Sequence, residues 1–263
     1  MSHSERRHLR EFYEEEASRI NHQKLMYVTG SRHDVWWHRK RLKHIVSLLV
    51  QILKEGHVDV FVDVGCAEGY YVDLISSLNS ELVCIGVDIS RKYIEKAKKN
   101  VKGPNIDFVV CDVENLPFQQ RCLDVVLCSE VLEHVTNYRK AFDELYRVTE
   151  KYLVLSFPGH SYIYHIAVRF RFFRGFVNDI MADVGHISEI SIDKIRHLMK
   201  AYRNNVSIET RVGGALPLQL YETIPSIRLV NTIDHAICKM LRRLNIVGYT
   251  TIHVMKIRIQ RKP

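Results

Sequence analysis

The sequence contains no apolar run that approaches the ~20 residues needed to span a bilayer. Its first residues, MSHSERRHLREF, are charged where a secretory signal peptide needs an apolar stretch. Low-complexity segments and internal repeats are also missing, which argues against a disordered or collagen-like chain. We therefore expect a soluble, cytoplasmic protein without a transmembrane segment.

Cysteine is sparse, and its spacing fits neither a zinc site nor a disulfide framework. The six cysteines include no CxxC pair, and five of them lie inside or beside apolar, strand-like segments. We predict buried thiols in a reducing compartment and no metal site. The cysteines are Cys66, Cys84, Cys111, Cys122, Cys128 and Cys238.

Charge and hydrophobicity are those of an ordinary globular protein with an excess of cations. Of the 263 residues, 46% are hydrophobic and 26% are charged, which is enough to bury a large core. Lys and Arg number 38 against 30 Asp and Glu, so the formal net charge is +8. This balance leaves an anionic substrate, RNA or an acidic membrane surface open as partners.

From residue 58 onward, short β-rich runs alternate with longer helical ones. Apolar runs without polar alternation are typical of parallel strands covered by helices on both faces. Ser90 is a predicted N-cap for the helix at 91–101. The central strands are predicted at 58–65, 82–88, 106–112, 122–128 and 151–158.

Both ends of the chain lack this regular alternation of strands and helices. Residues 5–55 predict two or three helices with a break near 29–31, and residues 192–202 and 226–244 predict further helices. Two last β-like runs lie at 206–214 and 249–260.

The whole pattern predicts an α/β, Rossmann-like, doubly wound fold. It has a mostly parallel seven-stranded sheet with helices on both faces, an N-terminal helical cap and a C-terminal antiparallel strand. We expect residues 1–56 to form the cap, 57–159 a cofactor-binding core, and 160–263 to complete the same domain with helical insertions on the substrate side.

The turn after the first predicted strand runs from Asp63 to Gly69. Small residues at 65, 67 and 69 let the backbone bend sharply and let a ligand approach main-chain N–H groups at the start of a helix. A tight connection without a ligand would have the same composition. The turn alone is therefore weak support for a binding site.

Acidic residues end the next two strands. Asp88 stands 23 residues after Gly65, where a carboxylate accepts the hydroxyls of a ribose in dinucleotide folds. Asp112 ends the third strand, where a carboxylate or a main-chain group meets an adenine edge. The carboxyl edge of such a sheet is where ligands bind, so three polar groups at this edge predict a nucleoside site.

The series VDVGCAEG, GVDIS, CDVENLPF and LDVVLCSEVLEHV resembles the class I S-adenosylmethionine-dependent methyltransferases. The likeness is strongest to the group that includes the ubiquinone and menaquinone methyltransferases (methyltransferase type 11). It extends over residues 58–158, and four motifs appear in the right order and spacing. The resemblance implies a methyltransferase that uses S-adenosyl-L-methionine and releases S-adenosyl-L-homocysteine.

The resemblance also implies roles for individual residues. The turn with Asp63 would hold the methionine end of the cofactor, Asp88 the ribose hydroxyls, and Ser129 would line the sulfonium. The turn departs from the family at Ala67, where glycine is common. The implied cofactor-binding residues are Asp63, Gly65, Cys66, Ala67, Gly69, Asp88, Ile89, Asp112, Val113 and Ser129.

His134 is the candidate general base because it follows the fourth strand, near the expected methyl group. A packing or capping role is the alternative, since the LEHV pattern occurs in relatives with unlike acceptors. Glu130 and Glu133 have the same two interpretations.

The acceptor would be chosen by the cap and by insertions late in the chain. A break at Gly30 predicts a lid hinge, with Tyr13, Tyr27 or Arg32 reaching the cofactor carboxylate. Trp36 and Trp37 either contact ligand or fasten the cap to the core, and the second role is favoured. The candidate segments are 26–33, 36–41, 162–176 and the pair at 185–186. Alternating cations and aromatics at 169–174 suit phosphate, a lipid surface or stacked bases, or else a helix whose aromatics are core and whose arginines are solvated.

These observations predict methyl transfer to a small-molecule or lipid-linked acceptor, anionic ones included. Nucleic acid and a peripheral membrane surface are less favoured partners. An RNA or protein methyltransferase, a nicotinamide-dependent oxidoreductase and a non-catalytic scaffold are the alternative functions.

Overall fold

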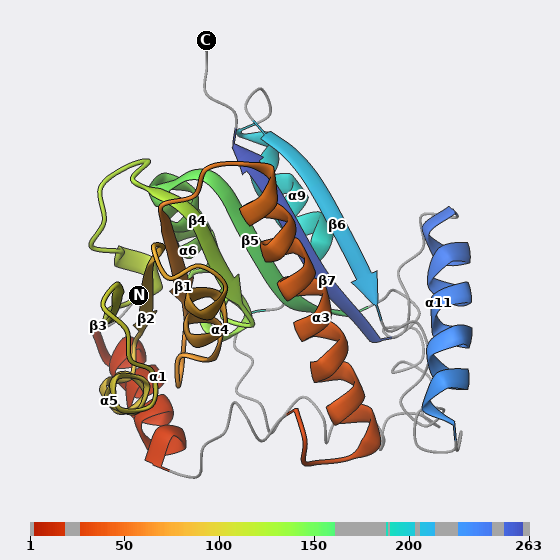
Figure 1. Cartoon of the computed structure of the whole chain (residues 1–263), viewed down its shortest axis with the longest axis horizontal. Coiled ribbons are helices and arrows are strands. Elements are labelled where there is room, and N and C mark those ends of the chain that lie inside the picture. The colour runs from red at the N-terminus through yellow and green to blue at the C-terminus, as the bar shows by residue number, and fades with distance from the viewer. Residues whose placement is uncertain are drawn as a thin grey trace.

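A seven-stranded sheet forms the centre of the protein, in the order β3-β2-β1-β4-β5-β7-β6 (Figure 1). The computed structural model describes residues 3–18, 27–160, 188, 190–202, 206–213, 226–243 and 250–259. β7 runs antiparallel to both of its neighbours, and the other pairs are parallel. The strands are β1 (Val60–Val64), β2 (Val83–Asp88), β3 (Ile106–Val110), β4 (Leu123–Ser129), β5 (Thr149–His160), β6 (Val206–Gly213) and β7 (Thr250–Ile259).

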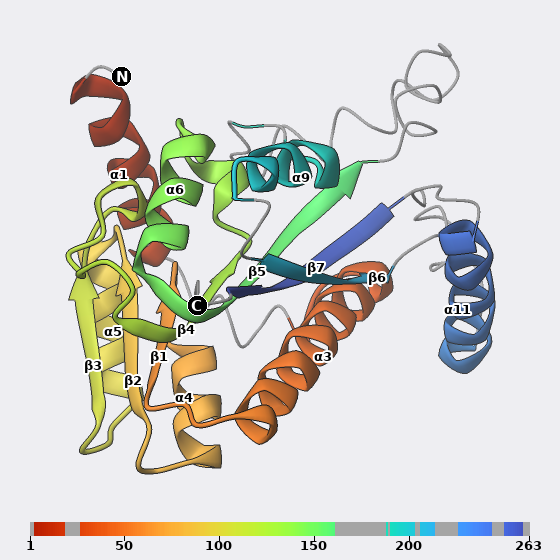
Figure 2. The same ribbon diagram turned by 90° about the horizontal axis from the view of Figure 1, so that it is seen from above.

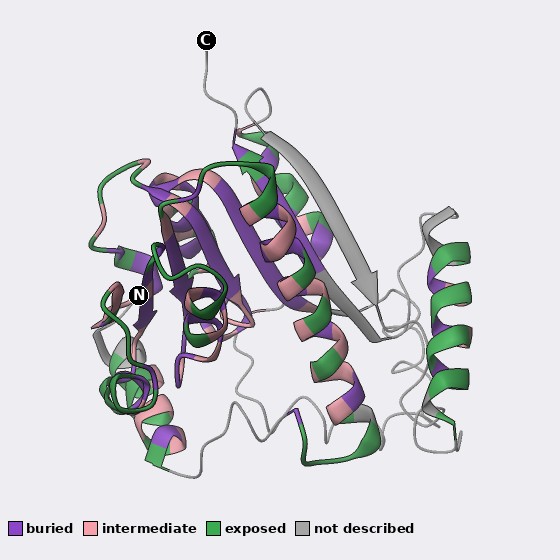
Figure 3. Cartoon of the chain, in the orientation of Figure 1, coloured by how far each residue is buried: buried purple, intermediate pink, exposed green. Residues whose placement is uncertain are grey.

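The prediction of a doubly wound, mostly parallel sheet with a C-terminal antiparallel strand is confirmed. Helices cover both faces, so the central strands are buried on both sides (Figures 2 and 3). One face packs against α3 (Arg32–Glu55), α4 (Tyr70–Leu78) and α5 (Arg91–Asn100). The other packs against α6 (Tyr138–Val148) and α9 (Ile192–Lys200).

Local sequence signals set the helix starts. The hydroxyl of Ser90 accepts a hydrogen bond from the Tyr93 amide at 3.3 Å, which confirms the predicted N-cap of α5. Ser31 caps α3 through the Asp34 amide, directly after Gly30 with φ of 115°. The predicted break between the first helices therefore lies just before α3.

The tryptophans of α3 connect that helix to its surroundings. Trp36 donates its indole N–H to Asn231 of α11 (Ile227–Arg243) at 2.8 Å, and Lys40 pairs with Asp234 of the same helix. Trp37 packs against the hydrophobic cluster between α3 and the sheet. The Arg41 guanidinium carbon lies over its ring, 4.9 Å from the ring centroid. Trp37 thus packs against the core as predicted, whereas Trp36 attaches α3 to α11, which the prediction did not include.

Two of the predicted substrate-recognition segments, 162–176 and 185–186, lie outside the described residues. Among the helices that are described, none is long and apolar enough to cross a membrane.

Candidate functional site

Four loops meet at the carboxyl edge of the sheet. Their strands are in register, with Val64 beside Val87 and Cys128, and Asp88 beside Val110. The loop after β3 contains the short helix η1 (Val113–Asn115), and the loop after β4 contains η2 (Leu132–His134). All the predicted cofactor-binding residues and His134 therefore lie along one edge.

The turn after β1 is held by its own main-chain amides. The N–H groups of Gly65 and Cys66 both donate to the Val87 carbonyl, at 2.8 and 3.0 Å, and Gly69 N–H donates to the Cys66 carbonyl. Ala67 N–H donates to Asp88 Oδ2 at 2.9 Å. These four amides stabilise the bend, a use that the sequence did not predict.

The turn requires small residues. Gly65 has φ of 79°, and a Cβ there would lie 2.2 Å from Val131 Cγ2. Gly69 has φ of 83°, and its Cβ would meet the Phe108 ring at 2.9 Å. Ala67, the departure from the family pattern, also has a left-handed φ of 43°, which is strained for a residue with a side chain.

Asp88 links two loops at the end of β2. Besides Ala67 N–H, it accepts the Ser90 N–H through Oδ1 at 2.9 Å, which fixes the carboxylate against the turn. Burial raises the pKa of Asp88 to about 6, and these two main-chain hydrogen bonds oppose the shift. Ile89 follows, half-buried.

The loop after β3 is tied to the loop after β4. Asp112 accepts the Glu114 N–H at 2.9 Å and begins η1, and Val113 is buried. Glu114, also buried, accepts the Thr136 hydroxyl and the Asn137 N–H, both at 3.1 Å. The predicted adenine-side residues and the segment with His134 are thereby held together.

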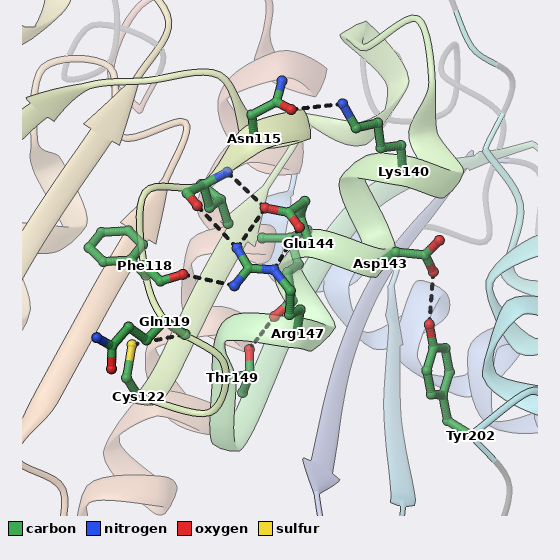
Figure 4. Close-up of polar contacts among 12 residues, drawn as sticks. Asn115, Phe118, Gln119, Cys122, Lys140, Asp143, Glu144, Arg147, Thr149 and Tyr202 are labelled. Atoms are coloured by element: carbon green, nitrogen blue, oxygen red, sulfur yellow. Dashed lines mark hydrogen bonds and ion pairs between the residues drawn. The ribbon is translucent and has the colours of Figure 1, made fainter.

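An ion pair on α6 holds the continuation of that loop (Figure 4). Arg147 donates to the carbonyls of Phe118 and Leu116, at 2.8 and 3.1 Å, and Glu144 accepts the Leu116 N–H at 2.9 Å. Arg147 and Glu144 pair at 2.7 Å. Nothing in the spacing of these residues revealed the clamp, because its partners are about thirty residues apart.

Two buried carboxyl groups at this edge have oxygens without a hydrogen-bond partner among the described residues. They are Asp63 Oδ2 on β1 and both oxygens of Glu133 on η2, and each residue is 1% exposed. Burial, and then Asp88, raise the pKa of Asp63 to about 8. Burial, and then Glu130, raise the pKa of Glu133 well above its ordinary value.

Arg41 supplies a buried cation beside these acids. Its Nη1 lies 3.1 Å from Glu130 Oε2, and Glu130 Oε1 accepts the Ser156 hydroxyl at 2.8 Å. Ser129 shares a hydrogen bond with Ser156 at 2.9 Å, so the predicted sulfonium-side residue belongs to this network. Burial opposes the charge of Arg41, but Glu130, Tyr71, Tyr27 and Glu133 together outweigh it and raise the pKa of Arg41.

Glu130 has φ of 56°, an uncommon conformation for a non-glycine residue. Such strain persists where the surroundings fix the backbone, and it is common at functional sites. The Glu130 N–H donates to the Ser156 carbonyl at 3.0 Å, which anchors the strained residue to β5.

The N-terminal helix α1 (His3–Ser18) lies beside α5 and over this edge (Figure 1). Glu14 accepts the Arg91 and Lys92 N–H groups at 2.7 and 3.2 Å, so it caps α5 from another helix. The ring of Tyr13 contacts the ring of His134. Burial, then Glu16, Glu133 and Asp88, raise the pKa of Tyr13.

The lid with its hinge at Gly30 stays a prediction. Tyr27 lies beside α4, with its ring 5.0 Å from that of Tyr70. Arg32 begins α3 and is exposed. Sequence reasoning named Arg41 only within the candidate segment 36–41 and did not single out Glu14; the partners of both residues are distant along the chain.

A family model described as a methyltransferase domain matches residues 62–154. The match covers about a third of the chain. The matched methyltransferase domain covers β1 to β5 and all four loops of the site.

Relatives and solved structures agree with this assignment. The ubiquinone/menaquinone biosynthesis C-methyltransferase of Campylobacter jejuni is 31% identical over 123 residues, which are 45% of this chain and 49% of that protein. The chain spans about half the length of the curated relatives it matches.

Two solved structures share the fold beyond the methyltransferase domain. The magnesium protoporphyrin IX methyltransferase of Synechocystis, with bound S-adenosylhomocysteine, has a TM-score of 0.62 at 15% identity and covers 96% of this chain and 98% of its own. A Haemonchus contortus phosphoethanolamine N-methyltransferase has a TM-score of 0.55 at 15% identity, with 81% and 52% covered. The fold is that of class I S-adenosylmethionine-dependent methyltransferases.

Proposed function

We propose that the protein transfers a methyl group from S-adenosylmethionine to a small-molecule or lipid-linked acceptor, at oxygen, nitrogen or carbon. The family match of residues 62–154 and the convergence of four loops on one sheet edge support this proposal. Anionic acceptors are included because the chain carries a net charge of +8.

Asp63 Oδ2 and both oxygens of Glu133, buried without a hydrogen-bond partner among the described residues, are the observation that carries the proposal. An unpaired buried carboxyl is costly, and sites that keep one commonly bind a complementary charge. S-adenosylmethionine has two positive centres, its ammonium and its sulfonium. The site offers one buried acid for each of these positive centres, Asp63 and Glu133. Both acids lie at the carboxyl edge of the sheet with Asp88.

The residues that would hold the cofactor follow from this placement. Asp63 and the turn from Gly65 through Cys66 and Ala67 to Gly69 would hold the methionine end, and Asp88 the ribose hydroxyls. Ile89, Asp112 and Val113 would flank the adenine, and Ser129 would lie near the sulfur. The cofactor supplies an activated methyl group, so the protein must chiefly position the acceptor and exclude water.

His134 is the proposed general base for acceptors that must lose a proton. It stands on η2, next to Glu133, and Tyr13 of α1 covers its ring. The α1 helix would shield this residue from water while its imidazole accepts the proton.

The charge of the site disfavours a nicotinamide dinucleotide. Its pyrophosphate would face Asp63, which has no partner on Oδ2 among the described residues. A 2′-phosphate would need a cationic site beside Asp88, and the Glu14 carboxylate already caps the start of α5 there. An RNA or protein acceptor remains the alternative that shares the same cofactor site.

The test is detection of methyl transfer with isotopically labelled S-adenosylmethionine and cell extract, followed by mass spectrometry of the products. We expect a labelled small molecule or lipid with the wild-type protein and none with Asp63→Asn. Label on RNA or protein alone would support the alternative acceptor. Absence of labelled product together with absence of donor binding would overturn the proposal.

A further inference from the structure

Glu133 is enclosed by groups from four elements. Tyr13 approaches it from α1, Arg41 from α3, Cys128 from the end of β4, and Glu130 from the segment before η2. Arg41 is the one cation among these four groups, and it forms an ion pair with Glu130. Both Glu133 oxygens are left without a hydrogen-bond partner among the described residues.

The position of Glu133 relative to Asp88 shows which part of a bound nucleoside it would face. The ring of Tyr13 contacts that of His134, the neighbour of Glu133. Burial and then nearby acids, Glu133 and Asp88 among them, raise the pKa of Tyr13, so the two acids lie near the same tyrosine. Asp63 and Glu133 also interact with the same thiol, Cys128. A nucleoside held by its ribose at Asp88, with its sulfur extended toward the loop after β4, would face Glu133 on η2.

We propose that Glu133 is a specificity-determining residue that recognises the positive charge of the donor, so that the protein binds the methylated sulfonium better than the neutral thioether product. This inference rests on the proposed function. Asp63 is assigned to the ammonium, which donor and product share, and Glu133 to the sulfonium, which only the donor has. A buried carboxylate attracts a cation strongly because little solvent screens the pair.

The roles assigned to Asp63 and Glu133 can be distinguished by comparing the affinities of ligands with and without a positive charge at the sulfur position. Isothermal titration would measure the affinities of S-adenosylmethionine, S-adenosylhomocysteine and sinefungin, in which a protonatable amine replaces the methylated sulfur. Glu133→Gln should lower the affinities for S-adenosylmethionine and sinefungin by about tenfold relative to the affinity for S-adenosylhomocysteine. Glu133→Asp should retain part of the preference because it keeps the charge.

Proton release gives a second readout that does not depend on activity. Glu133 should ionise when a cation binds beside it, so titrations in buffers of different ionisation enthalpy should show about one more proton released by S-adenosylmethionine than by S-adenosylhomocysteine. Both ligands carry the ammonium that would face Asp63, so any proton released from Asp63 is the same for both and cancels when the two proton counts are subtracted. In Glu133→Gln the difference should disappear.

Glu114→Gln is the matched control, since Glu114 is also buried but is satisfied by Thr136 and Asn137. It should leave the ratio of the two affinities unchanged. Equal weakening of both ligands by Glu133→Gln in a protein with native melting behaviour would overturn the inference. Failure of every adenosyl ligand to bind the wild-type protein would instead overturn the proposed function.

Discussion

The ring of Tyr13 meets the ring of His134 edge to face, with 5.9 Å between centroids and 90° between planes. This contact joins the N-terminal helix to the loop after β4, two parts of the chain separated by most of the methyltransferase domain. It places a phenol directly over the proposed general base. The cap is therefore part of the site as well as a cover for the sheet.

Substitutions at Tyr13 and His134 distinguish two roles: Tyr13 shields the site, and His134 accepts a proton during catalysis. Tyr13→Phe keeps the ring contact, whereas Tyr13→Ala should lose about 1 kcal/mol of stability and some donor affinity. His134→Ala should abolish turnover and leave donor affinity unchanged, as judged by titration and a labelled-methyl assay. Retained turnover in His134→Ala would reduce this histidine to a packing residue.

The turn after β1 should not tolerate a side chain at Gly65. Gly65→Ala places a Cβ 2.2 Å from Val131 Cγ2 at a φ of 79°. We expect a loss of about 2 to 4 kcal/mol in the free energy of unfolding, measured by chemical denaturation. Val131→Ala in the same protein should recover about 1 kcal/mol, the steric part of the loss. If the losses of unfolding free energy from Gly65→Ala and Val131→Ala simply add in the double variant, Val131 does not clash with the new side chain.

Asp63 should make the protein less stable at alkaline pH. Its pKa is raised from 3.8 to about 8 in the folded protein, so the folded state binds more protons than the unfolded state between these values. The free energy of unfolding therefore falls as the pH rises from about 4 to about 8.

Asp63→Asn removes this dependence while keeping the shape of the side chain. At pH 8 the variant should be more stable than the wild type by about 1 to 3 kcal/mol, although it binds the donor more weakly. Denaturation at pH 5 and pH 8 measures the difference. A variant that is less stable than the wild type at both pH values would show that Asp63 is satisfied in the folded protein.

Glu14 should hold α1 against the start of α5. Glu14→Ala removes the acceptor for the Arg91 and Lys92 amides and should cost about 1 kcal/mol of local stability. Hydrogen exchange at those two amides should become faster. Glu11→Ala is the control, because Glu11 makes an exposed pair with Arg7 on the same helix and should change little. Unchanged exchange in Glu14→Ala would show that the cap does not form in solution.

The sequence predicted the strands of the sheet, the cap at Ser90 and the edge at which polar residues gather. Each of these follows from local pattern, since a buried parallel strand is apolar throughout and a serine before an amphipathic run begins a helix. The assignment of residues to the cofactor and the division at 56 and 159 remain predictions.

The contacts that complete the site were not predictable in the same way. Arg41 reaches Glu130, and Glu14 reaches Arg91, across long separations that leave no periodic signal. The excess of basic residues in the sequence did not reveal the two buried acids, Asp63 and Glu133, at this edge. Arg41, which pairs with Glu130, is a neighbouring cation of Glu133. Only the folded arrangement shows that these carboxyls lack partners among the described residues.

Calorimetric titration of the wild-type protein with S-adenosylmethionine, S-adenosylhomocysteine and NAD tests the central claim most directly. The account predicts that both adenosyl-sulfur ligands bind, that NAD does not, and that Asp88→Ala weakens the two ligands by about 1 to 3 kcal/mol through loss of the ribose contacts. Binding of NAD in place of the adenosyl-sulfur ligands, or an affinity that Asp88→Ala leaves unchanged, would contradict it.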